Sequence, residues 1–158
     1  MAMRDFFKNV IRRNGLFTAK VSAIDNFVYT LSVDSGAELI EAFTAFVKER
    51  KIKHGIICGI GAVECATLRF FDPISKTYQD REFNEQMEIA HLEGNISTLD
   101  GKVYLHIHAV FGKSDCTAVA GHLLNAKIKG AGEFFIQRYC TTAPRKFSED
   151  IGLNIYDF

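Results

Sequence analysis

Hydrophobic and polar residues alternate along most of this chain, and this alternation is typical of strands. It predicts two strands over Phe17–Ile24 and Asn26–Val33, joined by a short turn. Similar patterns predict further strands over His54–Ile60, Cys65–Phe71, Tyr78–Phe83, Met87–Leu92, Val103–Phe111, Ala126–Ile128 and Glu133–Cys140. Because most connections are short and turn-like, we expect a mainly antiparallel twisted sheet.

One segment follows a helical period instead. A stripe of apolar residues recurs at helical spacing and comprises Leu39, Ile40, Phe43, Phe46 and Val47. Ser35 and Glu38 precede it in the arrangement of a capping box. The spacing of apolar residues in segment 1–16 also allows a short amphipathic helix there. We therefore predict an α+β fold with one long amphipathic helix and few short ones.

The length and charge of the chain limit the classes to which it can belong. Its 158 residues suffice for one domain, with 47% hydrophobic residues and a net charge of zero. We expect an N-terminal extension with the first strand over 1–23 and a single domain over 24–158. A strongly basic nucleic-acid binder is disfavoured by the balanced charge.

The N-terminal sequence lacks the apolar run of a signal peptide, and no stretch reaches the length of a membrane span. The four cysteines form no Cys-x-x-Cys pair and are interpreted as free thiols, most simply as buried structural residues. The absence of both targeting signals predicts a cytoplasmic location, where free thiols are expected.

The most informative chemistry lies in the sequence Leu105-His106-Ile107-His108-Ala109. Side chains alternate between the faces of a strand, so His106 and His108 point the same way, roughly 6–7 Å apart along it. His122 follows after a loop, and a hairpin return would bring it alongside them. Three imidazoles with an open position are typical of a catalytic zinc site, although other divalent transition metals accept such ligands.

Two other interpretations of these histidines stay open. His106 and His108 could be polar positions on an exposed sheet face, and Cys116, which lies between His108 and His122, could approach a metal as a thiolate. The other two histidines lack a comparable partner and are expected to be structural or solvated. The candidate acceptors or bases near the site are carboxylates, namely Glu88, Glu93, Asp115 and Glu133.

Several motifs in order resemble the plants and prokaryotes conserved (PPC) domain. They are Gly59-Ile60-Gly61-Ala62-Val63, Ala66-Thr67-Leu68-Arg69-Phe70-Phe71-Asp72, the segment 88–97, the two histidine motifs and the terminal Gly152-Leu153-Asn154-Ile155-Tyr156-Asp157-Phe158. The resemblance spans about residues 24–158. It implies an α+β fold that assembles as a homotrimer, with bacterial members labelled as DNA-binding proteins.

The fold of this family is also similar to acetolactate decarboxylase, in which three histidines hold zinc. That kinship implies that His106, His108 and His122 are metal ligands, with zinc the expected metal. The sequence departs from the DNA-binding relatives of plants because it contains no AT-hook. The zero net charge also removes most of the electrostatic affinity for DNA, so we expect weak or non-specific binding at most.

Two functions follow from these patterns. The first is a metal-binding PPC-domain protein of the family labelled as DNA-binding, inside the cell and with a regulatory role. The alternative is a metal-dependent enzyme, or a binder of a small anionic metabolite, that uses the three-histidine site. The sequence assigns no catalytic residue and leaves open whether the protein is an enzyme.

Overall fold

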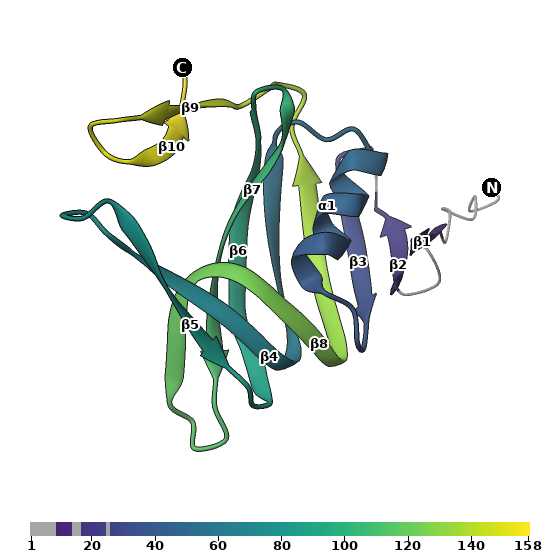
Figure 1. Cartoon of the computed structure of the whole chain (residues 1–158). Coiled ribbons are helices and arrows are strands. Elements are labelled where there is room, and N and C mark those ends of the chain that lie inside the picture. The colour runs from purple at the N-terminus through teal and green to yellow at the C-terminus, as the bar shows by residue number, and fades with distance from the viewer. Residues whose placement is uncertain (1–8, 14–16, 25) are drawn as a thin grey trace, which may run out of the picture.

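The computed structural model describes residues 9–13, 17–24 and 26–158 of the chain (Figure 1). Strands dominate the described part, and the elements in chain order are β1 (Asn9–Arg13), β2 (Phe17–Ala23), β3 (Val28–Asp34), α1 (Leu39–Glu49), β4 (Gly55–Asp72), β5 (Thr77–Phe83), β6 (Met87–Leu99), β7 (Lys102–Gly112), β8 (Ala118–Arg138), β9 (Pro144–Ser148) and β10 (Leu153–Tyr156). No helix in this part of the chain is long and apolar enough to cross a membrane.

All ten strands belong to one sheet, in which β4, β6 and β8 each pair with three other strands. Strand β8 pairs with β3, with β4 and with β7, while β6 pairs with both β4 and β7. These pairings close a circuit of β4, β6, β7 and β8. Apart from the short parallel pairing of β6 with β9, the pairings are antiparallel, as predicted.

The core lies between the sheet and α1, which packs against β8 and β7 (Figure 1). The rings of Phe43 and Phe134 meet edge to face at 4.8 Å, and those of Tyr29 and Phe46 do so at 5.3 Å. Both helix residues are fully buried. The apolar stripe predicted from the sequence is therefore the face that α1 presents to the sheet.

The helix is shorter than predicted, with 11 residues, and it is the one helix in the described residues. Its N-cap is Glu38, whose carboxylate accepts hydrogen bonds from the backbone N–H groups of Ile40 and Glu41. The predicted capping box is therefore not the one that forms, because Ser35 instead accepts from the N–H of Gly130. Glu38 also accepts from the N–H of Ala126 and so ties the helix start to β8.

Two pairs of predicted strands are each one long strand. His54–Ile60, apart from His54 itself, and Cys65–Phe71 lie within β4, while Ala126–Ile128 and Glu133–Cys140 fall largely within β8. Register shifts between β4 and β8 interrupt the alternation without ending either strand. The interruptions of the alternating pattern are therefore bulges inside continuous strands, and bulges of this kind also bend a strand.

The N-terminal segment differs from the prediction where it is described. Asn9–Arg13 is strand β1, paired with β2, so the predicted helix does not form over these residues. The rest of that helix lies outside the described residues. Because β2 pairs with β3, both strands extend the main sheet, and the division at residue 24 stays a prediction.

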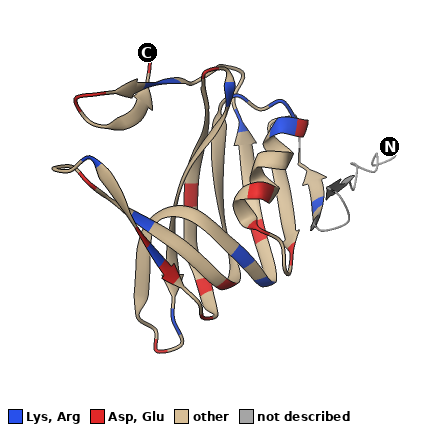
Figure 2. Ribbon diagram, in the orientation of Figure 1, with Lys and Arg blue, Asp and Glu red and all other residues tan. Residues whose placement is uncertain are grey.

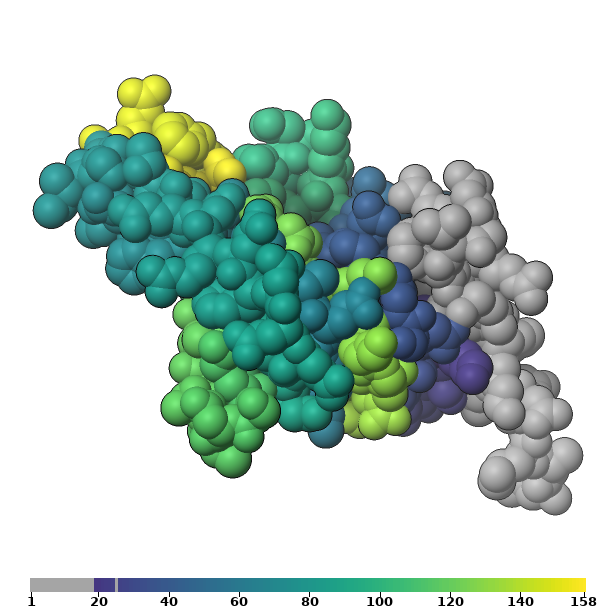
Figure 3. Space-filling view, turned by 60° about the horizontal axis from the view of Figure 1, so that its bottom comes forward, coloured from purple at the N-terminus to yellow at the C-terminus, as the bar shows by residue number. Residues whose placement is uncertain are grey.

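Two hairpins project on the side of the molecule away from α1 (Figure 1). One is formed by β4 and β5, and the other by β9 and β10. Their tips meet, because the Lys76 ammonium donates to the carbonyl of Glu149 at 2.6 Å. Figure 3 shows the same contact from below, where the blue-green tip of the first hairpin lies against the yellow C-terminal segment.

Candidate metal centre

His106, His108 and His122 form a compact cluster, with one ring nitrogen from each within 4.8 Å of the others. Their ring centroids are 5.2 Å, 5.0 Å and 5.4 Å apart. In the described residues, this is the one group of three or more histidine, cysteine or acidic side chains placed to share an ion. The structure therefore brings together the three histidines that the sequence predicted to meet.

Strand pairing explains this meeting. His106 and His108 lie on one face of β7, while Leu105 and Ile107 point to the core. His122 of β8 is directly opposite His108, so its side chain emerges on the same face. Just after His122, Leu68 of β4 pairs with Leu123, but the preceding β4 residue, Thr67, pairs with Asn125. One residue of β8 is therefore unpaired, which marks a bulge. Bulges of this kind often occur where a strand turns a side chain toward a site.

Burial favours the neutral form of two of these imidazoles, His122 and His106. It lowers the pKa of His122 to about 4, with further lowering from His106, His108 and Arg69. Burial also lowers the pKa of His106, and the charges of His108 and Arg145 act in the same direction. Neutral imidazole is the form that binds a metal, because protonation occupies the ligand nitrogen.

The residues present fit a metal ion. The Nδ1 atom of His122 is buried and has no hydrogen-bond partner. Buried polar atoms are almost always paired, so an unpaired nitrogen inside a cluster of three imidazoles needs an explanation. A metal ion bound by these nitrogens would supply one.

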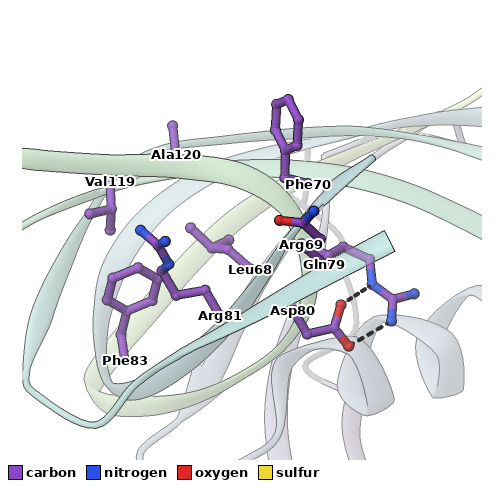
Figure 4. A pocket seen from close by; sticks show the side chains of 9 residues that line it. All are labelled: Leu68, Arg69, Phe70, Gln79, Asp80, Arg81, Phe83, Val119 and Ala120. Atoms are coloured by element: carbon purple, nitrogen blue, oxygen red, sulfur yellow. Dashed lines mark hydrogen bonds and ion pairs between the residues drawn. The ribbon is translucent and has the colours of Figure 1, made fainter. Parts of the chain in front are cut away.

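A charged pair lies on the β4–β5 side of the cluster. The guanidinium of Arg69 donates two hydrogen bonds of 2.9 Å to Asp80, and these bonds hold the pKa of that carboxyl below its usual range. Tyr78 contacts both sides, with its ring 4.7 Å from the guanidinium of Arg69 and 5.8 Å from the ring of His122. Figure 4 shows the pair at the edge of a cavity of about 440 Å³ that none of the three histidines lines.

A second cavity, of about 400 Å³, opens beside the cluster and is lined by His106 and His108. Asn95 and Tyr156 line it as well, and both contact the guanidinium of Arg145. Glu93, predicted as a candidate carboxylate, also lines this cavity. This is the space through which a ligand could reach a metal held by the histidines.

The other sequence candidates lie apart from the cluster. Glu88 and Glu133 line a different cavity, beside Ile60. Asp115 accepts from the N–H and the hydroxyl of Thr117 in a turn. Cys116 is exposed in the same turn and does not belong to the histidine group.

The two remaining histidines do not join the cluster either. His54 shares a 2.7 Å hydrogen bond with Thr141, although it lines the cavity that His106 and His108 line. His91 is exposed and lies 3.4 Å from the carboxylate of Glu93. Sequence reasoning did not assign Asn95, Tyr156 or Arg145 to the site; the latter two lie far beyond the histidines along the chain.

Comparison with solved structures supports the fold and offers a metal-containing relative. The chain is 48% identical to a protein of Bacteroides thetaiotaomicron described as a "putative DNA binding protein", with a TM-score of 0.86 and coverage of 89% of this chain and 97% of that one. It is 29% identical to a protein of Archaeoglobus fulgidus described as metal-containing, with a TM-score of 0.79 and coverage of 99% and 100%.

A more distant likeness concerns the fold alone. A Staphylococcus aureus protein of unknown function, described as similar to alpha-acetolactate decarboxylase, matches with a TM-score of 0.50 and 12% identity, over 81% of this chain and 70% of that one. This agrees with the decarboxylase-like fold predicted from the sequence. No curated protein matches the chain.

The family itself follows from a match over most of the chain. The profile of the Plants and Prokaryotes Conserved (PCC) domain matches residues 24–139, a range that contains α1 and all three histidines of the cluster. This is the family that the sequence motifs resemble. The chain belongs to the Plants and Prokaryotes Conserved (PCC) domain family.

Proposed function

We propose that this protein binds one divalent transition metal ion through His106, His108 and His122, with zinc as the metal. The observation that carries the proposal is the cluster itself, with three ring nitrogens within 4.8 Å of one another. The unpaired Nδ1 of His122 adds support, as does the archaeal relative described as metal-containing. The donor set suits zinc, which commonly takes imidazole nitrogen.

Three protein ligands leave a coordination position for an exchangeable group. Structural zinc sites use four protein ligands, whereas sites with three keep a place for water or substrate. The cavity of about 400 Å³ beside His106 and His108 gives a small molecule access to that place. We therefore propose that the protein binds a small anionic ligand at its metal.

A metal-dependent enzyme is the alternative function. When bound, the metal would polarise a ligand or activate a water molecule. Among the carboxylates that the sequence singled out, Glu93 lines the cavity and is the candidate to accept a proton there. No catalytic residue is assigned, and a cytoplasmic location with a regulatory role stays a prediction.

DNA binding is a second candidate, and one surface feature favours it. Four lysines, at positions 48, 51, 53 and 102, line a cavity of about 480 Å³ at the end of α1. Figure 2 shows basic segments gathered at this end of the molecule. With a net charge of zero, however, the whole chain supplies little counterion release, so we propose weak, non-specific binding.

A homotrimer is proposed from the family resemblance, and the sheet surface supports self-association. Ile60 of β4 and Phe135 of β8 are 57% and 51% exposed on neighbouring strands. Large apolar side chains on an outer sheet face are typical of an interface. Closed three-fold assembly would bury such a face without forming open-ended fibres.

The metal proposal predicts that replacement of all three histidines abolishes metal binding. Wild-type protein purified without a chelator or a histidine tag should contain about one metal ion per chain by elemental analysis, and the triple alanine variant should contain none. His91→Ala is the matched control, because this exposed histidine lies outside the cluster. A triple variant that keeps stoichiometric metal would place the site elsewhere.

The depressed pKa of His122 predicts how the metal-free protein responds to pH. Between its ordinary pKa of about 6.5 and the folded value of about 4, the unfolded chain binds a proton that the folded chain does not. The stability that neutral His122 contributes is therefore fully present above pH 6.5, and this contribution is lost as the pH falls toward 4. Urea unfolding with a chelator at pH 7.5 and 5 should show a larger loss for wild type than for His122→Gln. Equal losses would contradict the prediction.

The assembly proposal predicts a solution mass near three times the 17.7 kDa of one chain. Light scattering measures this directly. Phe135→Glu should lower the mass toward that of one chain, because it places a charge on the apolar face. Gln79→Glu, on the exposed strand β5 and not on this face, is the control for an added charge. A wild-type mass near that of one chain would contradict the proposal.

The DNA proposal predicts a dissociation constant weaker than about 10⁻⁶ M for mixed duplex DNA at 150 mM salt, without sequence preference. Fluorescence anisotropy provides the measurement. Lys51→Gln with Lys102→Gln should weaken the residual binding, because both lysines line the basic cavity. Tighter binding that depends on sequence would restore DNA as the main ligand.

A further inference from the structure

Arg145 of β9 is a buried arginine held only by neutral groups. It is 9% exposed. Its Nε donates to the hydroxyl of Ser97 at 2.7 Å, Nη1 to the carbonyl of Asn154 at 2.8 Å, and Nη2 to the side-chain oxygen of Asn95 at 2.7 Å. The ring of Tyr156 lies 4.2 Å from the guanidinium carbon and covers it.

No ion pair in the described part of the chain involves Arg145. Buried charges are usually paired, because removal of an ion from water is costly. The contrast with Arg69 is direct, since that guanidinium is matched by the carboxylate of Asp80. Arg145 therefore contributes a fixed positive charge that the described residues around it do not cancel.

That charge lies behind one wall of the cavity beside the histidines. Asn95 and Tyr156 contact the guanidinium, and both line the cavity together with His106 and His108. Asn95 is also the strand partner of His106. A guanidinium has five N–H donors, of which three are used by the bonds to Ser97, Asn154 and Asn95.

We propose that Arg145 makes this cavity selective for a small organic ligand with a single carboxylate group. The inference rests on the proposed function, because the carboxylate would also occupy the open position of the metal. One uncompensated guanidinium suits one negative charge, and Glu93 in the lining disfavours a dianion such as phosphate. Ile56 and Tyr139, also in the lining, give the organic part of the ligand an apolar surface.

The hydrogen bonds of Arg145 also attach β9 to β6, so a purely structural role must be separated from a role in selection. A structural role would affect charged and neutral ligands alike. A role in selection would weaken the binding of a carboxylate and leave its neutral amide unchanged. Propionate and propionamide have nearly the same shape and differ in charge, so they are the probes.

The experiment uses the full chain loaded with Co²⁺, whose visible absorption reports exchange at its open position. Titration of wild type, Arg145→Gln and Lys146→Gln with each probe gives the affinities. Lys146 is the matched control, because it is the next residue on β9 and is exposed with a surface partner, Asp157. We expect Arg145→Gln to weaken propionate about tenfold, or about 1.4 kcal/mol, and to leave propionamide within twofold. Lys146→Gln should change neither.

A second variant keeps the arginine and cancels its charge. Asn95→Asp retains the oxygen that accepts from Nη2 and adds a carboxylate beside the guanidinium. It should also weaken propionate about tenfold and spare propionamide. If Arg145→Gln does not fold, this variant still tests the inference, because a carboxylate that cancels the guanidinium charge has to lower the preference for propionate. An unchanged preference for propionate over propionamide, in either folded variant, would overturn the inference.

The two proposals fail in different ways. If wild-type protein takes up no Co²⁺, the metal proposal is wrong and the present inference falls with it. If Co²⁺ binds and Arg145→Gln keeps the wild-type preference for propionate, the metal proposal stands and only the role of Arg145 is wrong. If both probes weaken equally in Arg145→Gln, Arg145 is a structural residue.

Discussion

The pairing of β4 with β8 along most of their lengths is the constraint on which the rest of the structure depends. The C-terminal part of β8 pairs with β3 and β4, and its N-terminal part pairs with β7 and β4, so the strand has to bend. Gly130, with a φ of +79°, allows a backbone conformation at this bend that other residues rarely adopt. Because the bend returns β8 to β7, His122 comes to lie opposite His108, and the candidate metal centre exists.

The sequence predicts the parts of this arrangement that depend on local pattern. The alternation around His106 and His108 places both on one face, and a chain reversal suffices to bring His122 near. It does not predict the length of β4 or β8, because bulges and glycines inside a strand look like breaks between strands. The helix is found by its apolar stripe, but its N-cap depends on a contact of Glu38 with distant Ala126. That contact has no local signal.

The surroundings of the centre are still less visible in the sequence. Arg145 meets Ser97 and Asn95 across separations of 48 and 50 residues, and a lone arginine near the C-terminus has no pattern that indicates burial. The zero net charge of the chain also gives no indication of the local positive charge near the histidines. Acidic and basic residues balance in number over the chain, yet a buried cation lies beside the histidines and four lysines line a cavity at the end of α1. Local charge therefore says more about ligands here than the total does.

The attachment of the C-terminal hairpin has a consequence for motion. Only two residue pairs, Thr98 with Pro144 and Leu99 with Arg145, join β9 to β6. The other ties described above are the hydrogen bonds of Arg145 and the tip contact at Lys76. Segments with so few contacts open by local unfolding well below the free energy of global unfolding. Amide hydrogens of β9 and β10 should therefore exchange with solvent sooner than those of β4 and β8, and each opening would carry the charge of Arg145 away from the histidines.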